Sequence, residues 1–153
     1  MSGVVVITGT MASGKSTVAQ ALAKRLPRAA HVRGDASRRM IVSGRAECTP
    51  EAAAVVQDVL LGPEPASYAE RIRTRPLHVV VLAPSPEAVA KREAGREAGR
   101  PKTGYGPAWT IAGLDAELRL RTDALGPWLD TSALTVEQTV AAIVTGTERA
   151  RAV

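Results

Sequence analysis

Residues 9–17 combine the residue types and the spacing that phosphate binding requires. They match the pattern G-x-x-x-x-G-K-[S/T], in which glycines let the backbone turn tightly enough for successive N–H groups to face phosphate oxygens. A helix that begins at the end of the loop adds the positive end of its dipole at the same place. The residues assigned to this nucleotide-binding loop are Gly9, Thr10, Met11, Ala12, Ser13, Gly14, Lys15, Ser16 and Thr17.

Two side chains of the loop have distinct chemical roles. Lys15 is expected to take part in catalysis by reaching the β- and γ-phosphates, and the hydroxyl of Ser16 is expected to coordinate magnesium, Mg²⁺. A chance match to the fixed positions of the pattern has a probability of about 1% in a chain of this length. An apolar, β-branched run at residues 4–7 precedes the loop, and a helical pattern at residues 16–26 follows it. The sequence therefore predicts binding of ATP or a similar nucleotide, without deciding between ATP and GTP.

Asp35 is the candidate for the proton transfer that a phosphorylation reaction needs. It follows a weaker strand pattern at residues 30–32, which places it at the carboxyl edge of a parallel sheet, where ligands bind. A carboxylate there can accept the proton of an attacking hydroxyl as a general base. The alternative is that Asp35 caps a short helix over residues 36–42, and the two roles are compatible.

Asp58 is the candidate for a second metal contact. It lies in an apolar run at residues 55–61 that is predicted to be the third strand. A carboxylate inside such a strand is costly unless it is paired or lies near a metal ion. Asp58 is therefore expected to hold the water shell of Mg²⁺, and the alternative is an exposed polar residue at the strand end.

Cationic side chains gather in and before residues 95–108, a Gly- and Pro-rich segment that is predicted to form a mobile, lid-like loop. Such a loop can close over the phosphates and neutralise charge in the transition state. Arg92 is assigned a catalytic role, and Arg96 and Arg100 are assigned to nucleotide binding. These three arginines are spaced four residues apart, so the alternative is one solvated helix face.

The remaining patterns predict the elements that position these residues. Further strands are expected at residues 77–82 and 128–130, and further helices at residues 66–74, 85–93, 112–122 and 135–148, the last with a capping box from Thr135 to Gln138. Strands that alternate with helices predict an α/β three-layer sandwich, a five-stranded parallel sheet with helices on both faces. Thr131 and Ser132 follow the last strand and are expected near the adenine. Trp109 and Trp128 are expected in the core, with the alternative that Trp109 contacts a flat substrate.

Composition sets the wider limits. A length of 153 residues predicts a single domain over residues 1–153. No run of 18 apolar residues and no basic segment before the first strand occur, so neither a membrane partner nor a signal peptide is expected. A single cysteine, Cys48, fits a reducing cytoplasm. The net charge of +5 is spread along the chain, so a nucleic-acid partner is not favoured, and a homodimer stays open.

Several of these motifs occur together in a known order: the phosphate-binding loop, Asp35 after Arg33-Gly34, residues 57–62, the arginine-rich segment and residues 128–132. Over almost the whole chain, this order resembles the chloramphenicol phosphotransferase-like group of small P-loop kinases, which is related more distantly to shikimate, gluconate and nucleotide kinases. The resemblance implies ATP-dependent phosphorylation of a hydroxyl on an antibiotic or small metabolite, with Asp35 as the base and Asp58 as an acidic strand-end residue. The alternative is a nucleotide-binding regulatory or nucleic-acid-associated P-loop module without kinase activity.

The sequence departs from this family at two places. Gln57 stands where some relatives carry a second aspartate. In addition, only residues 51–54 separate Pro50 from the predicted third strand, where relatives have a long helix and a Gly-containing turn. The sequence therefore predicts either an acceptor site that is open on this side or an interruption of the chain between Glu51 and Val55.

Overall fold

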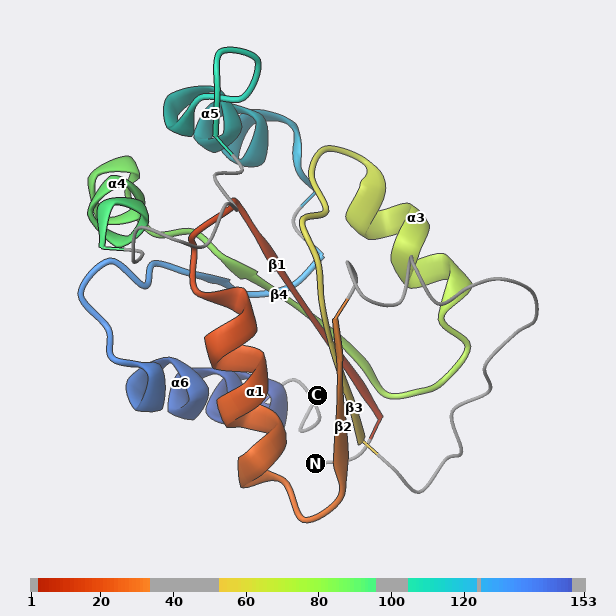
Figure 1. The fold of residues 1–153 in the computed structure, drawn as a ribbon. Helices are drawn as coiled ribbons and strands as arrows, with labels where there is room; N and C mark the ends of the chain where they lie inside the picture. The colour runs from red at the N-terminus through yellow and green to blue at the C-terminus, as the bar shows by residue number, and fades with distance from the viewer. Residues whose placement is uncertain (1–2, 34–52, 96–104, 124, 150–153) are drawn as a thin grey trace.

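A single parallel sheet forms the centre of the computed structural model, which describes residues 3–33, 53–95, 105–123 and 125–149 (Figure 1). Its five strands lie in the order β2-β3-β1-β4-β5, and every pairing is parallel. The strands are β1 (Val4–Gly9), β2 (Ala29–Arg33), β3 (Ala53–Gln57), β4 (Leu77–Leu82) and β5 (Trp128–Leu129). The sheet and its helices confirm the predicted α/β fold.

The strand β1 occupies the middle of the sheet because both of its faces are apolar. All six of its residues are buried between β3 and β4. Val5 and Ile7 point into a core shared with α1 (Lys15–Arg25) and α6 (Val136–Arg149), whereas Val4 and Val6 point into a core on the opposite face. A parallel strand that is covered on both faces reads as a continuous apolar run, which is why residues 4–7 were recognisable in the sequence.

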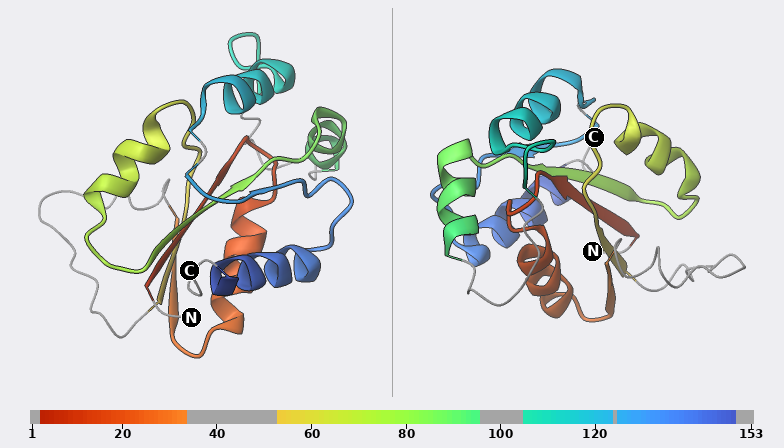
Figure 2. Two further views of the ribbon diagram at one scale, coloured as in Figure 1. Left: turned by 180° about the vertical axis from the view of Figure 1, so that it is seen from behind. Right: turned by 45° about the horizontal axis from the view of Figure 1, so that its top comes forward.

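Helices cover the two faces of the sheet (Figures 1 and 2). The pair α1 and α6 packs on one face, and α3 (Glu64–Arg71) packs on the other through Tyr68, Ala69 and Ile72. Two further helices, α4 (Pro86–Ala94) and α5 (Ile111–Arg121), contact each other near the carboxyl end of β1. The carboxyl edge of the sheet, where the phosphate-binding loop leaves β1, is therefore flanked by α4, α5 and the first turn of α1.

The helix starts follow the local chemistry of the sequence. The predicted capping box is confirmed, since Gln138 N–H donates to Thr135 Oγ1 at 3.2 Å and Thr135 N–H donates to Gln138 Oε1 at 2.8 Å. Ser85 caps α4 by accepting from the N–H of Ala88 at 3.3 Å, and Thr110 caps α5 by accepting from Gly113 at 3.0 Å. The helix α3 begins at residue 64 and ends at residue 71, earlier than the predicted residues 66–74.

The third strand differs from its prediction. It spans Ala53–Gln57 instead of residues 55–61, because Thr8 closes off its carboxyl end: the Thr8 hydroxyl donates to Leu60 O at 2.8 Å and accepts from Leu60 N at 2.9 Å. Asp58 therefore lies just after the strand and not inside it, so the argument from burial within a strand does not apply to it.

The predicted chain interruption between Glu51 and Val55 is not found where the structure can test it. Ala53, Ala54 and Val55 are successive residues of β3 and pair in register with β2. Residues 51–52 lie outside the described part of the chain, as do the predicted helix at residues 36–42 and most of the lid-like segment.

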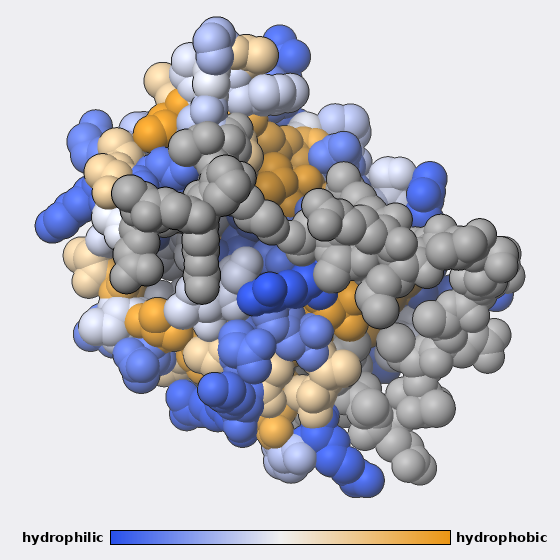
Figure 3. Space-filling view, in the orientation of Figure 1, coloured by the Kyte–Doolittle hydropathy of each residue, from blue (hydrophilic) through white to orange (hydrophobic). Residues whose placement is uncertain are grey.

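The two tryptophans have different environments. The prediction that Trp109 lies in the core is wrong, because 58% of this residue is exposed on a tight turn before α5. Trp128 is partly buried against Val81 and Leu118, as predicted. On the face shown in Figure 3, hydrophobic residues form separate groups among hydrophilic ones. Within the described ranges, no helix combines the length and the apolar character needed to cross a membrane.

Candidate functional site

The loop between β1 and α1 has the backbone that its glycines predict. Gly9 has φ 145°, and a Cβ atom at this position would lie 2.3 Å from the carbonyl oxygen of Leu82. Gly14 has φ 96° with open space around it, so glycine is favoured there by the backbone conformation alone. These two residues let the chain leave β1 close against β4 and enter α1 in a left-handed conformation.

The first turn of α1 lacks the protein acceptors that cover other helix starts. Gly14 precedes the helix with no side-chain hydrogen bond to it, and no acidic residue lies in its first turn. By contrast, α4 and α5 are capped by Ser85 and Thr110. Backbone N–H groups at an uncapped helix start attract anions, because they are unpaired donors at the positive end of the helix dipole. This arrangement suits a phosphate group.

Lys15 lies inside the loop and not on its surface. Only 7% of the residue is exposed, and its ammonium group donates to the carbonyl oxygens of Gly9 at 3.1 Å and Thr10 at 2.7 Å. A buried ammonium is costly without such partners. The charge is therefore held beside the place where the loop and the helix start would receive phosphate oxygens.

Ser16 meets a residue that the sequence analysis did not assign to the site. Its hydroxyl donates to Oε1 of Gln57, the last residue of β3, at 3.3 Å. Asp58, which was predicted as the metal contact, has a different local arrangement: its Oδ1 accepts from the N–H of Val59 at 2.8 Å. The alternation of side chains along β3 is the signal that identifies Gln57.

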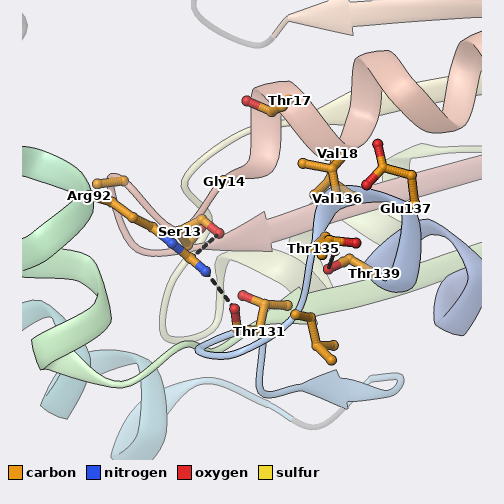
Figure 4. A pocket seen from close by; sticks show the side chains of 12 residues that line it. Ser13, Gly14, Thr17, Val18, Arg92, Thr131, Thr135, Val136, Glu137 and Thr139 are labelled. Carbon is orange, nitrogen blue, oxygen red and sulfur yellow. Dashed lines mark hydrogen bonds between the residues drawn. The ribbon is translucent and has the colours of Figure 1, made fainter. Parts of the chain in front are cut away.

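Arg92 joins two parts of the site that are far apart in sequence. From α4 its guanidinium donates to the carbonyl oxygen of Ser13 at 3.2 Å and to that of Thr131 at 2.5 Å (Figure 4). The predicted site residues Arg92 and Thr131 are therefore brought together at the phosphate-binding loop. The contacts are with main-chain oxygens, so Arg92 holds the segment after β5 against the loop.

A cavity of about 550 Å³ opens beside this contact, between the phosphate-binding loop and the start of α6 (Figure 4). Its volume is within the range of small-molecule pockets. The hydroxyls of Ser13 and Thr131 have no hydrogen-bond partner among the residues that the structure describes, so they remain available to a ligand. The lining residues are Ala12, Ser13, Gly14, Thr17, Val18, Arg92, Thr131, Leu134, Thr135, Val136, Glu137 and Thr139.

Ser132, predicted beside the adenine, is not among the residues that line this cavity. Its hydroxyl accepts from the N–H of Ser85 at 2.7 Å and donates to Oδ1 of Asp130 at 2.5 Å. The hydrogen bonds from the hydroxyl and the N–H of Ser132 hold the pKa of Asp130 below its ordinary value. Ser132 thus connects the end of β5 to the start of α4.

Tyr105 gives the loop a further contact. Its phenol donates to the carbonyl oxygen of Met11 at 2.6 Å. The turn that follows is closed by two hydrogen bonds of 3.1 Å between Gly106 and Trp109. The segment before α5 is therefore attached to the tip of the phosphate-binding loop.

Three predicted site residues, Asp35, Arg96 and Arg100, lie outside the described residues. Within those that are described, no group of three or more His, Cys, Asp or Glu side chains is placed to hold a metal ion. Mg²⁺ at phosphate sites is usually bound through one or two protein groups together with the phosphates. The hydroxyl of Ser16 next to the oxygen of Gln57 fits that kind of site.

Known structures resemble this chain over nearly its whole length. A sugar kinase from Janibacter sp. HTCC2649 has a TM-score of 0.65 and 19% identity, with 97% of this chain and 95% of that chain covered. A gluconokinase from Sinorhizobium meliloti 1021 has a TM-score of 0.62 and 23% identity, with 96% and 92% covered. The tunicamycin resistance protein of Deinococcus radiodurans has a TM-score of 0.63 and 18% identity, with 95% of each chain covered.

The chain has the fold of small P-loop kinases. At these identities the likeness is one of fold, and no protein-family model and no curated protein matches the sequence. The predicted resemblance is thus confirmed for small P-loop kinases in general, and the narrower likeness to the chloramphenicol phosphotransferase-like group stays a prediction.

Proposed function

We propose that this protein is a small-molecule kinase, which uses ATP and Mg²⁺ to phosphorylate a hydroxyl group of a small metabolite or an antibiotic. The observation that carries the proposal is the position of Lys15. Its buried ammonium lies against the carbonyls of Gly9 and Thr10, directly before an uncapped helix start. Positive charge and free N–H groups therefore converge on one point, beside a cavity of about 550 Å³ that is suited to the nucleobase and ribose.

Nucleotide binding would use the residues of this site in a defined way. The phosphate oxygens accept from the N–H groups at the start of α1, and the ammonium of Lys15 turns from the loop carbonyls to the β- and γ-phosphates. Ser16, backed by Gln57, would hold Mg²⁺, which when bound neutralises charge on the β- and γ-phosphates. Arg92 keeps the wall of the cavity in contact with the loop through Ser13.

Transfer then requires an acceptor and a base. The acceptor oxygen bonds to the γ-phosphorus, the bond from that phosphorus to the β–γ bridging oxygen breaks, and ADP leaves. We assign the acceptor's proton to Asp35, which follows β2 by two residues in the sequence. Because all strands are parallel, β2 and β1 end at the same edge of the sheet, which is where an acceptor would meet the phosphates.

The similar structures suggest which acceptors to test first. They include proteins described as a sugar kinase, a gluconokinase and a tunicamycin resistance protein. We propose a polyhydroxylated small molecule as the acceptor, either a sugar or sugar acid or an antibiotic with a free hydroxyl.

The experiment is a screen for ADP release that depends on the acceptor, over sugars, sugar acids and hydroxyl-bearing antibiotics, with phosphorylated product identified by mass. Lys15→Ala serves as the inactive control. Stimulated ADP release with a phosphorylated product supports the kinase. A protein that binds ATP but phosphorylates none of these acceptors would instead favour a nucleotide-binding module without kinase activity.

A further inference from the structure

The strand β3 presents two neighbouring polar residues to opposite sides of the sheet. Val55 packs in the core shared with α1 and α6, and Val56 packs in the core on the α3 face. Side chains alternate along a strand, so Gln57 lies on the side of Val55 and faces α1. Asp58 follows the side of Val56, and Leu60 continues that side in the α3 core. Of the two polar residues, only Gln57 is therefore directed at the helix that carries Ser16.

The contact between Gln57 and Ser16 agrees with this placement. Gln57 is 6% exposed, and its Oε1 lies 3.3 Å from the Ser16 hydroxyl, which belongs to a residue 41 positions earlier. Ser16 itself is exposed at the first turn of α1. A buried amide thus supports an exposed hydroxyl at the mouth of the phosphate site.

The direction of this hydrogen bond determines what Ser16 can do. A serine hydroxyl has one proton to donate and two lone pairs. When Gln57 Oε1 accepts the proton, the lone pairs of Ser16 face away from Gln57 and remain available for a cation. Asp58 Oδ1, on the other side of the strand, accepts from the N–H of Val59 at 2.8 Å.

We infer that Gln57, and not Asp58, positions the Ser16 hydroxyl toward the metal ion that accompanies the nucleotide. This inference rests on the proposed function. Gln57 is a positioning residue, because it acts through Ser16. Its amide is neutral, so it orients the hydroxyl without adding negative charge to the metal site. The ion is therefore held mainly by the phosphates, and its affinity should rise when a carboxylate replaces the amide.

The experiment measures ATP affinity by calorimetry at saturating EDTA and over a Mg²⁺ titration, for wild type and four variants. Gln57→Leu keeps a similar volume but has no acceptor, so its ATP affinity in EDTA should equal that of wild type, while the Mg²⁺ concentration at half-effect rises about 10-fold or more. Gln57→Glu restores an acceptor with charge and should lower that concentration below the wild-type value.

Two variants serve as controls. Asp58→Asn should leave the Mg²⁺ dependence unchanged. Gln20→Leu should do the same, since Gln20 lies on the exposed side of α1, where its Oε1 is 3.0 Å from Nδ1 of His31. Affinity in EDTA also reports on folding, so a variant that no longer folds is recognised by its loss of metal-free binding, and Gln57→Glu then decides the question.

The outcomes separate the two proposals. If wild type binds no ATP under any condition, the proposed function is wrong. If wild type binds ATP, and Mg²⁺ dependence is lost in Asp58→Asn but kept in both Gln57 variants, then the inference on Gln57 is overturned and the proposed function stands.

Discussion

The guanidinium of Arg92 donates to the main-chain oxygen of Ser13 at 3.2 Å, which fixes α4 to the phosphate-binding loop. The same group reaches the carbonyl of Thr131, so Arg92→Ala leaves two oxygens without this donor. We expect a loss of about 1–3 kcal/mol in the free energy of unfolding, measured with urea, and weaker ATP binding. Arg121→Ala is the matched control. Arg121 pairs with Glu117 on an exposed helix surface, so its removal should cost less than about 0.5 kcal/mol. Equal losses in the two variants would contradict the role given to Arg92.

Lys15→Ala should abolish turnover and strongly weaken ATP binding, because the β- and γ-phosphates lose their main cationic side chain. Folding should be retained, since the alanine removes a buried charge together with its need for partners. Calorimetry with ATP and a coupled ADP assay measure the two effects. Lys24→Ala, at the exposed end of α1, should leave both unchanged. Wild-type affinity and rate in Lys15→Ala would refute the phosphate-binding loop.

Asp35→Asn tests the proposed base. We expect ATP affinity to remain and the rate of phosphate transfer to fall by about 10²–10⁴-fold, which is the usual contribution of general base catalysis. Single-turnover kinetics with saturating acceptor separates this step from binding. A variant that is less stable but has normal activity per folded molecule would show that Asp35 acts as a helix cap.

Gly9→Ala and Gly146→Ala should have opposite effects on stability. At Gly9 the backbone has φ 145° and a Cβ would lie 2.3 Å from Leu82 O, so strain alone should cost at least about 1–3 kcal/mol. At Gly146, inside α6, a Cβ meets nothing within 4 Å, so alanine should stabilise by about 0.5–1 kcal/mol. Thermal unfolding of both variants measures the difference, and a stabilised Gly9→Ala would show that the close approach to β4 is wrong.

Asp130→Asn should lose stability at neutral pH but not in acid. The pKa of Asp130 is held below its ordinary value by the hydrogen bonds from Ser132, so the ionised form is favoured in the folded state. The stabilisation is fully present above the pKa of the unfolded chain and is lost as the pH falls through the lowered folded pKa. Asp130 is exposed, so the difference should stay below about 1 kcal/mol. Urea unfolding at neutral and acidic pH measures it, and a carboxyl titration by NMR should show that Ser132→Ala raises the pKa of Asp130.

The parts of the fold that sequence predicted well are those with local causes. The phosphate-binding loop, β1 and β4 follow from glycine spacing and from continuous apolar runs between two covered faces. The capping box at Thr135 depends on a residue only three positions away, and it was also predicted correctly.

The errors arose where distant contacts decide. Thr8 bonds to Leu60 across 52 positions and ends β3 earlier than its apolar run indicates. Because side chains alternate, this boundary also determines which of Gln57 and Asp58 faces α1. The partners of Arg92 lie 79 and 39 positions away, so the sequence could propose a functional arginine but not its contacts. Asp35, Arg96 and Arg100 lie outside the described residues and stay predictions.

The bond between Tyr105 and Met11 supplies the protein with an intrinsic optical reporter. The chain has two tryptophans, and Trp109 is held by its turn four positions after the tyrosine that is anchored to the tip of the phosphate-binding loop. Its indole is mostly exposed, so its emission is sensitive to small changes in surroundings, whereas Trp128 is partly buried beside β4 and gives a steadier background. A shift of the loop as phosphate enters would move Tyr105 and with it the environment of Trp109. Occupation of the site can therefore be followed by the fluorescence of the unlabelled protein.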